Sequence, residues 1–271
     1  MDNTHRSPGK VLSHLPAVAV SRLDRILISA SIALVTILAW AYLVHLDHQM
    51  SAAMQDERVM AAMGMTMDKV WTLVDGWFTF AMWTVMMAGM MAPTALPMLL
   101  LFAAARAGRD QKGLSLPTLA FGLGYIAVWT TFSAGATLAQ YGLHQAALLS
   151  PAMASSSGRL NGAILLAAGA YQLTPWKAKC LAHCRSPLGF LMTQWRDGTT
   201  GAFQMGFRHG VFCLGCCWAI MCLLFVVGVM NLVWIAMITV FVLIEKVGPA
   251  GAFVARLAGA AMILSGIAAV A

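Results

Sequence analysis

The sequence predicts an all-α protein, a polytopic membrane helix bundle of about seven transmembrane helices with a cytoplasmic N-terminus. Six helices are the alternative count. Hydrophobic residues make up 60% of the 271 residues and charged residues only 10%, whereas soluble domains carry roughly 25% charged residues. Apolar stretches long enough to cross a bilayer recur along the chain. The basic residues lie at the ends of these stretches, where they act as topology signals and do not indicate nucleic-acid binding.

The helices are expected to follow one another in a single transmembrane domain, residues 26–271, after a flexible basic cytoplasmic tail, residues 1–25. The expected spans are Ile26–Leu46, Trp77–Ala104, Leu116–Tyr141, Leu160–Leu173, Met205–Val227, Leu232–Ile244 and Gly251–Ala271. Pro175 stops the fourth span. Only a tight turn separates the fifth from the sixth, so these two form a hairpin. The count falls to six if the last helix does not cross fully.

The distribution of basic residues sets the expected orientation. With the N-terminus inside, only Arg58, Lys69 and Arg159 of the 17 Lys and Arg residues face outward, as the positive-inside rule requires. The methionine-rich connection 47–76 then lies outside, either as an extended metal-scavenging tract or as an amphipathic helix on the membrane. The cysteine-bearing loop 174–207 lies in the cytoplasm.

The stretch MWTVMMAGMMAPTALPM, residues 82–98, concentrates methionine in the second predicted helix. Wound as an α-helix, it places Met87, Met91 and Met98 on one stripe. The adjacent stripe carries Met86, Met90, Pro93 and Pro97. Thioether sulfur is a soft donor that suits Cu(I), although methionine also serves as an adaptable filler between helices. Each proline removes a backbone hydrogen bond, so we expect this helix to bend.

The stretch MGFRHGVFCLGCCW, residues 205–218, gathers a second set of soft side chains in the fifth predicted helix. His209, Cys213 and Cys217 are four residues apart, and Cys216 follows Cys213 by three, so all four share one helical face. Cys222 points away from it. One imidazole and several thiols on one stripe suit a soft metal ion. A single buried cysteine is more commonly a small core residue, so the grouping carries the prediction.

The stretch KCLAHC, residues 179–184, adds Cys180 and Cys184 at the same membrane face. We expect them to complete a composite site with the cysteines of the fifth helix. The neighbouring cations Lys177, Lys179 and Arg185 are expected to lower the pKa of these two thiols and to favour the thiolate, which binds metal. Zinc is the alternative metal at a four-ligand Cys/His site. The methionines favour Cu(I), because zinc makes little use of thioethers.

Two pairs of polar residues lie at helix ends. Glu245 and Lys246 end the sixth predicted helix. Ionisable groups inside a membrane are functional candidates, but at this boundary they can also snorkel or pair. Tyr171 and Gln172 are expected to form interhelical hydrogen bonds rather than to bind metal.

Four blocks of the sequence resemble one family, the bacterial predicted metal-binding integral membrane proteins, whose function is uncharacterised. The blocks are MMAGMMAPTALPM, AGAYQLTPWKAKCLAHCRSP, GVFCLGCCWAIM and VGVMNLVW with Glu-Lys after it. They occur in the family's order from about Trp77 to the C-terminus. The resemblance implies metal binding and a multi-pass protein of the bacterial inner membrane, and it carries over no catalytic residue.

The leading functional hypothesis is Cu(I) handling, by transfer, transport or metallation, with the lipid bilayer and a metallochaperone or membrane complex as partners. The sequence contains no phosphate-binding glycine loop and no soluble nucleotide domain, which argues against active pumping, and it favours a non-enzymatic role. One alternative is a membrane thiol redox component, since Cys213 and Cys216 form a C-x-x-C pair. Another is a structural or assembly subunit of a larger membrane complex.

Overall fold

The computed structural model describes residues 21–62, 71–107, 116–148 and 155–270. Helices dominate these ranges, and every predicted span falls on at least one of them. In chain order they are α1 (Arg22–Ala62), α2 (Leu73–Ala107), α3 (Leu116–Gln145), α4 (Gly158–Gln172), α5 (Pro175–Arg185), α6 (Pro187–Gln194), α7 (Gly198–Met221), α8 (Leu224–Val227), α9 (Leu232–Val247) and α10 (Gly251–Val270).

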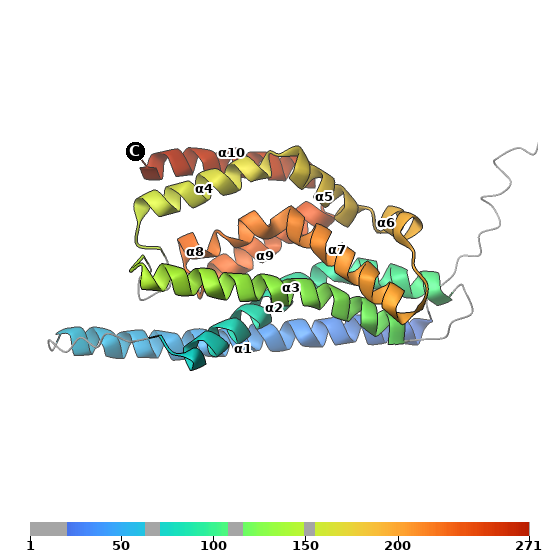
Figure 1. Cartoon of the computed structure of the whole chain (residues 1–271), viewed down its shortest axis with the longest axis horizontal. Helices are drawn as coiled ribbons and strands as arrows, with labels where there is room; N and C mark the ends of the chain where they lie inside the picture. Colours follow the sequence, from blue (N-terminus) through green and yellow to red (C-terminus); the bar gives the residue numbers. More distant parts are fainter. Residues whose placement is uncertain (1–20, 63–70, 108–115, 149–154, 271) are drawn as a thin grey trace, which may run out of the picture.

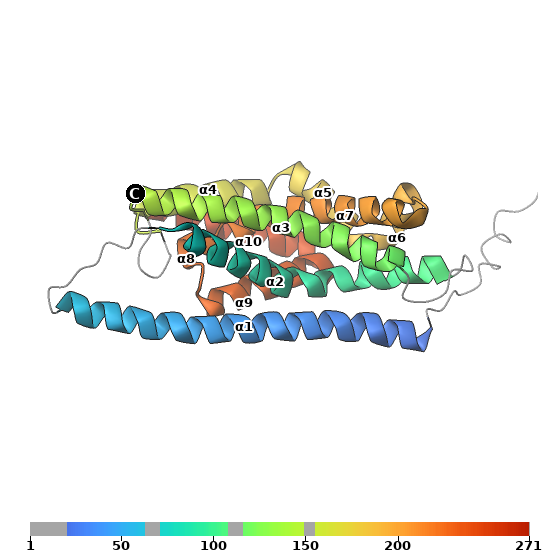
Figure 2. The ribbon, with the colours of Figure 1, turned by 60° about the horizontal axis from the view of Figure 1, so that its bottom comes forward.

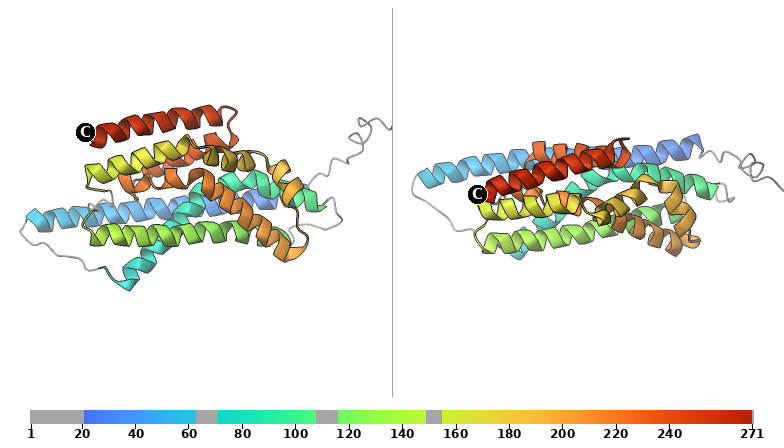
Figure 3. Two further views of the ribbon diagram at one scale, coloured as in Figure 1. Left: turned by 45° about the horizontal axis from the view of Figure 1, so that its top comes forward. Right: turned by 90° about the horizontal axis from the view of Figure 1, so that it is seen from above.

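The long helices lie side by side in one elongated bundle (Figure 1). α1 lies along one edge and packs mainly on α2, while α2 packs on α3 and α3 on α7 (Figure 2). α4 and α10 form a pair on the opposite side (Figure 3). α1 begins at one end of the bundle and α10 stops at the other (Figure 1).

Five helical stretches in the described residues are long and apolar enough to cross a membrane. They are Arg22–Ala52, Leu73–Ala107, Leu116–Gln145, Gly198–Val227 and Gly251–Val270. α4 has 15 residues and α9 has 16, and both are shorter than the roughly 20 residues that a perpendicular span needs. The helical bundle is therefore confirmed, while the count of seven spans and the cytoplasmic N-terminus stay predictions.

Two segments expected to be connections are helical over much of their length. α1 continues through the first part of the methionine-rich connection to Ala62, because residues 47–62 contain neither glycine nor proline to interrupt a helix. Met63, Met65 and Met67, on which the scavenging interpretation depended, lie outside the described residues. The tail 1–25 also lies mostly outside them.

The expected cytoplasmic loop contains α5, α6 and the start of α7. Pro175 and Pro187 each occupy the first turn of a helix, where the missing backbone N–H costs nothing. The hydroxyl of Thr174 caps α5 by accepting a hydrogen bond from the backbone N–H of Lys177 at 3.2 Å. Pro175 thus ends one helix and starts the next.

Close backbone contact between α3 and α7 places the soft side chains of α7 in the core. A side chain at Gly206 would overlap the backbone carbonyl of Phe121, and one at Gly124 would overlap that of Phe203. Gly122 and Gly135 of the same helix α3 face open space. α2 contains both of its prolines and changes direction along its length, as predicted (Figure 2).

Candidate metal centre

The inward face of α7 carries the predicted soft ligands. The side chains of Met205, His209, Cys213, Cys216 and Cys217 are all buried. Cys222 follows the last residue of the helix and is only partly buried. The predicted division between a shared face and an outlying Cys222 therefore agrees with the burial of these side chains.

Cys213 lies at the middle of a polar cluster inside the bundle. Its Sγ atom is 2.9 Å from the Nζ atom of Lys246 in α9 and 3.1 Å from the hydroxyl oxygen of Tyr125 in α3. The same Lys246 ammonium lies 3.3 Å from the hydroxyl of Thr94 and 3.7 Å from the Sδ atom of Met91, both in α2. One thiol thus connects three helices through two polar side chains.

The other predicted cysteines lie around the same turns of α7. Cys184 of α5 packs against the cluster that contains Cys213 and Cys216, and the thiols of Cys216 and Cys217 donate hydrogen bonds to the backbone carbonyl of Cys213 at 3.1 and 3.0 Å. Cys180 lies against Gly215, where an added side chain would come 2.8 Å from its Sγ atom. Within the described part of the chain, no three His, Cys, Asp or Glu side chains already surround one metal position. Binding through several thiols therefore requires side-chain rotation.

All five predicted methionines of α2 are buried, but they occupy different places. Met91 contacts Lys246, and Met98 lies further along α2 in a cluster with Phe102 and Phe121. The remaining three, Met86, Met87 and Met90, pack in the same apolar cluster as Cys213, Cys216 and Cys217. The structure therefore brings the two sets of soft side chains together. Met91 contacts Lys246, which also contacts the Cys213 thiol.

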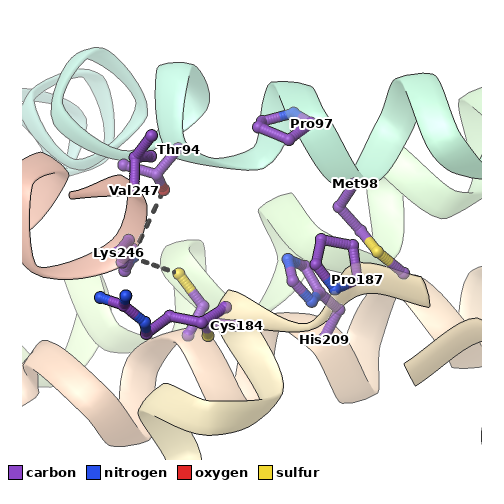
Figure 4. A pocket seen from close by; sticks show the side chains of 10 residues that line it. Thr94, Pro97, Met98, Cys184, Pro187, His209, Lys246 and Val247 are labelled. Carbon is purple, nitrogen blue, oxygen red and sulfur yellow. Dashed lines mark hydrogen bonds between the residues drawn. The ribbon is translucent and has the colours of Figure 1, made fainter. Parts of the chain in front are cut away.

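A cavity of about 200 Å³ adjoins the Cys213 centre (Figure 4). Its lining residues are Thr94, Pro97, Met98, Cys184, Arg185, Pro187, His209, Cys213, Lys246 and Val247. Lys246 points toward Thr94 on one side, while His209, Pro187 and Met98 lie together on the other (Figure 4). The exposed residues Arg185, Pro97 and Val247 mark where the cavity meets the protein surface.

A buried ion pair lies next to the Cys213 centre. Its carboxylate belongs to Glu245, the neighbour of Lys246 in α9. The Lys177 ammonium lies 2.8 Å from both carboxylate oxygens of Glu245 and donates a hydrogen bond to the Gln172 side-chain oxygen at 2.6 Å. Gln172 in turn donates to Glu245. Arg185 donates to the backbone carbonyl of Glu245 at 2.7 Å. These bonds hold α4, α5 and α9 together, and so fix the backbone that carries Lys246.

The expected hydrogen-bonding role of Tyr171 and Gln172 is confirmed. The Tyr171 hydroxyl donates to the backbone carbonyl of Gly215 in α7, and Gln172 connects α4 to Glu245 in α9. Both residues join helices, and neither lines the cavity next to Cys213.

The expectation that nearby cations lower the pKa of the α5 thiols is wrong. Burial raises the pKa of Cys180. Hydrogen bonds with Cys213 and Cys216 raise the pKa of Cys184. Lys177 and Arg185 do not reach these thiols, because both are engaged with Glu245, and Lys179 is exposed. Lys246 of α9 instead contacts a cysteine, Cys213 of α7.

Sequence reasoning gave too little weight to Lys246 and did not single out Tyr125. The position of Lys246 at a predicted helix end is compatible with snorkelling to the surface, yet the residue is only 8% exposed. Tyr125 sits in an ordinary apolar helix pattern, and no local signal distinguishes it. Its role becomes visible only when α3 and α7 are placed against each other.

These observations define a bundle of membrane-length helices with a buried thiol, thioether and ammonium cluster. The chain belongs to the PpoB2 copper chaperone family, whose model matches residues 80–269. The match covers nearly the same residues as the family resemblance noted from the sequence blocks, and it connects the chain with copper handling. Neither the curated proteins nor the solved structures contain a match.

Proposed function

We propose that this protein is an integral membrane copper chaperone that binds Cu(I) at the Cys213 centre and passes it to a partner. The observation that carries the proposal is the Cys213 Sγ atom, 2.9 Å from the buried Lys246 ammonium and surrounded by further thiols. Membership of a copper chaperone family supports copper as the cargo. The proposed location is the inner membrane of a bacterium, with the N-terminus in the cytoplasm.

The chemistry of the centre favours Cu(I). Thiolates and thioethers are soft ligands that select Cu(I) over Mg²⁺ or Ca²⁺. The Lys246 ammonium stabilises the Cys213 thiolate by its opposite charge, in an interior where an isolated charge would be costly. Cu(I) accepts low coordination numbers, so Cys213 together with either Cys184 or Cys216 is a sufficient pair of anionic ligands.

The arrangement of soft side chains suggests a direction of transfer. Met86, Met87 and Met90 precede Met91 along α2, in the half of the helix that we assign to the outer side of the membrane. Cu(I) would move from these weaker thioether ligands to the thiolate of Cys213. His209 and Met98, on the α6 side of the cavity, would then lie toward the cytoplasmic exit, where a metallochaperone or a copper enzyme collects the ion.

A thiol redox component is the second candidate, and one observation favours it. The thiols of Cys184, Cys213 and Cys216 are all free and pack in one cluster, so two of them are candidates for a disulfide. This alternative predicts a titratable disulfide and no need for metal. Zinc is the alternative cargo, and would be retained by the thiols without the methionines.

The test is metal content and Cu(I) affinity of the full chain, purified in detergent without a metal-affinity resin. We expect near-stoichiometric Cu(I) after reconstitution under reducing conditions, measured by inductively coupled plasma mass spectrometry. We expect affinity to fall by at least about a hundredfold in Cys213→Ser, since even outer-shell partners of a metal are worth up to that much. A competing Cu(I) chelator that changes colour on binding measures the affinity.

Cys222→Ser is the matched control, because Cys222 directly follows α7 but does not line the cavity. It should bind copper as the unchanged chain does. No bound copper in the unchanged chain would refute the proposal. Zinc lost in Cys213→Ser would point to a zinc site, and a disulfide that forms reversibly without metal would favour the redox alternative.

A further inference from the structure

The cavity beside Cys213 is much larger than a metal ion. It measures about 200 Å³, whereas a water molecule in the liquid takes up about 30 Å³. It reaches from the buried Cys213 and Lys246 to the exposed Arg185 at the surface. A space of this size accommodates a small organic molecule together with the metal.

The charges that line the cavity do not favour the entry of a metal cation without an anionic ligand. Lys246 and Arg185 both line it, and none of the described residues that line it carries a carboxylate. The nearby Glu245 is already paired with Lys177. Arg185 donates one bond from Nη1 to the Glu245 backbone carbonyl, which positions a guanidinium with five N–H donors. The two positive charges of Lys246 and Arg185 exceed the single negative charge of the Cys213 thiolate, so the cavity repels free Cu⁺ and attracts an anion.

The imidazole of His209 also lines this space. The Nδ1 atom of His209 is buried without a hydrogen-bond partner, and the residue is only 3% exposed. Its ring lies at the cavity beside Pro187 and Met98 (Figure 4). Leaving a buried polar atom unpaired costs free energy, and a rotation of the ring that turns Nδ1 toward a polar group of an occupant would recover it.

We propose that the cavity binds a small organic anion that carries both a thiolate and a carboxylate, and that Cu(I) enters as a complex with it. This inference rests on the proposed copper function and names the form in which the cargo arrives. The carrier's thiolate shares the copper with Cys213. Its carboxylate pairs with Arg185, and His209 bonds a polar group of the carrier.

The entry step is a ligand exchange in which copper remains Cu(I). A copper ion held by two carrier thiolates forms a bond to the Cys213 sulfur. One carrier thiolate leaves with its electron pair and takes the proton of Cys213 if that residue is a thiol. The complex left in the cavity has two thiolates, one Cu(I) and one carboxylate, for a net charge of −2. Lys246 and Arg185 together supply the matching +2.

The test uses the full chain in detergent and two copper donors that differ only in the carboxylate. Cu(I) is offered with ¹⁴C-labelled mercaptoacetate or with labelled 2-mercaptoethanol, whose alcohol replaces the carboxylate. After desalting, copper and label are counted. We expect one mercaptoacetate retained per copper and little mercaptoethanol. Arg185→Gln should retain about tenfold less mercaptoacetate, because a charge-assisted hydrogen bond is lost.

Copper retained from mercaptoethanol shows whether Arg185→Gln still folds, since this donor does not need the guanidinium. Lys179→Gln is the matched control, because Lys179 is an exposed cation of α5 that does not line the cavity. It should retain mercaptoacetate fully. Repeating the measurement with labelled cysteine and labelled glutathione distinguishes the two cellular sources of such a carrier.

The outcomes separate this inference from the proposed function. If copper binds from both donors and no label is retained, the inference that the carrier stays bound with copper is overturned. The proposed copper site itself would still stand. Equal retention of mercaptoacetate in Arg185→Gln and in the unchanged chain would overturn the assigned carboxylate contact. Failure to bind copper from either donor would instead refute the proposed function itself.

Discussion

Two buried lysines of this bundle have opposite surroundings. Lys177 meets both oxygens of the Glu245 carboxylate and the Gln172 amide, all within one closed network. Lys246, whose neighbour in sequence is Glu245, meets a thiol, a hydroxyl and a thioether. Burial makes either charge costly without a partner. The fully paired Lys177 holds helices together, whereas Lys246 is placed to offset the negative charge of the Cys213 thiolate in the proposed copper site.

Breaking the Lys177 network should have the largest effect on stability. Glu245→Gln leaves the Lys177 ammonium buried without a counter-charge, and we expect a loss of about 3–5 kcal/mol in the free energy of unfolding. Denaturant unfolding in detergent, followed by tryptophan fluorescence, measures it. The double variant Lys177→Met/Glu245→Leu removes both charges and should recover most of the loss. An unchanged midpoint in Glu245→Gln would contradict the structural role of the pair.

Removing the second lysine should alter copper binding rather than folding. In Lys246→Met the Cys213 thiolate loses its nearest cation, so we expect Cu(I) affinity to fall by about tenfold or more, while the unfolding midpoint changes little. Chelator competition measures the affinity. Lys179→Met, which removes an exposed cation, serves as the control. Equal affinities in the Lys246 variant and the control would show that Lys246 has no part in the site.

The Tyr125 hydroxyl belongs to the surroundings of Lys246, because both groups contact the Cys213 sulfur. It lies 3.1 Å from the Cys213 sulfur and 3.3 Å from the backbone carbonyl oxygen of Met91, and its proton is donated to the sulfur when Cys213 is a thiolate. Tyr125→Phe should weaken copper binding about fivefold, since one hydrogen bond that orients the sulfur is lost. Tyr141→Phe, on the exposed part of α3, should have no effect. A hundredfold loss in Tyr125→Phe would instead indicate that the hydroxyl itself contacts the metal.

Much of the site was predictable because its parts lie on single helices. The spacing of His209, Cys213 and Cys217 determines that they share a face of α7, whatever packs against it. The same holds for the stripes of α2. The contact between Cys184 and the α7 thiols could not be deduced this way, because it depends on how α5 folds back along α7 after Pro175. The sequence predicted a composite site of Cys184 with the cysteines of α7, but it could not tell which turns of the two helices would meet.

The sequence by itself determined a helical, membrane-type chain, the bend of α2 and the soft face of α7. Composition and helical periodicity are local properties, and they survive any arrangement of the helices. Only the tertiary structure decided that Glu245 and Lys246 are both buried and have different partners. α9 has 16 residues and is therefore about 24 Å long, shorter than a bilayer core of about 30 Å. A helix of that length can end inside the bundle, so its terminal charges contact other helices instead of reaching water.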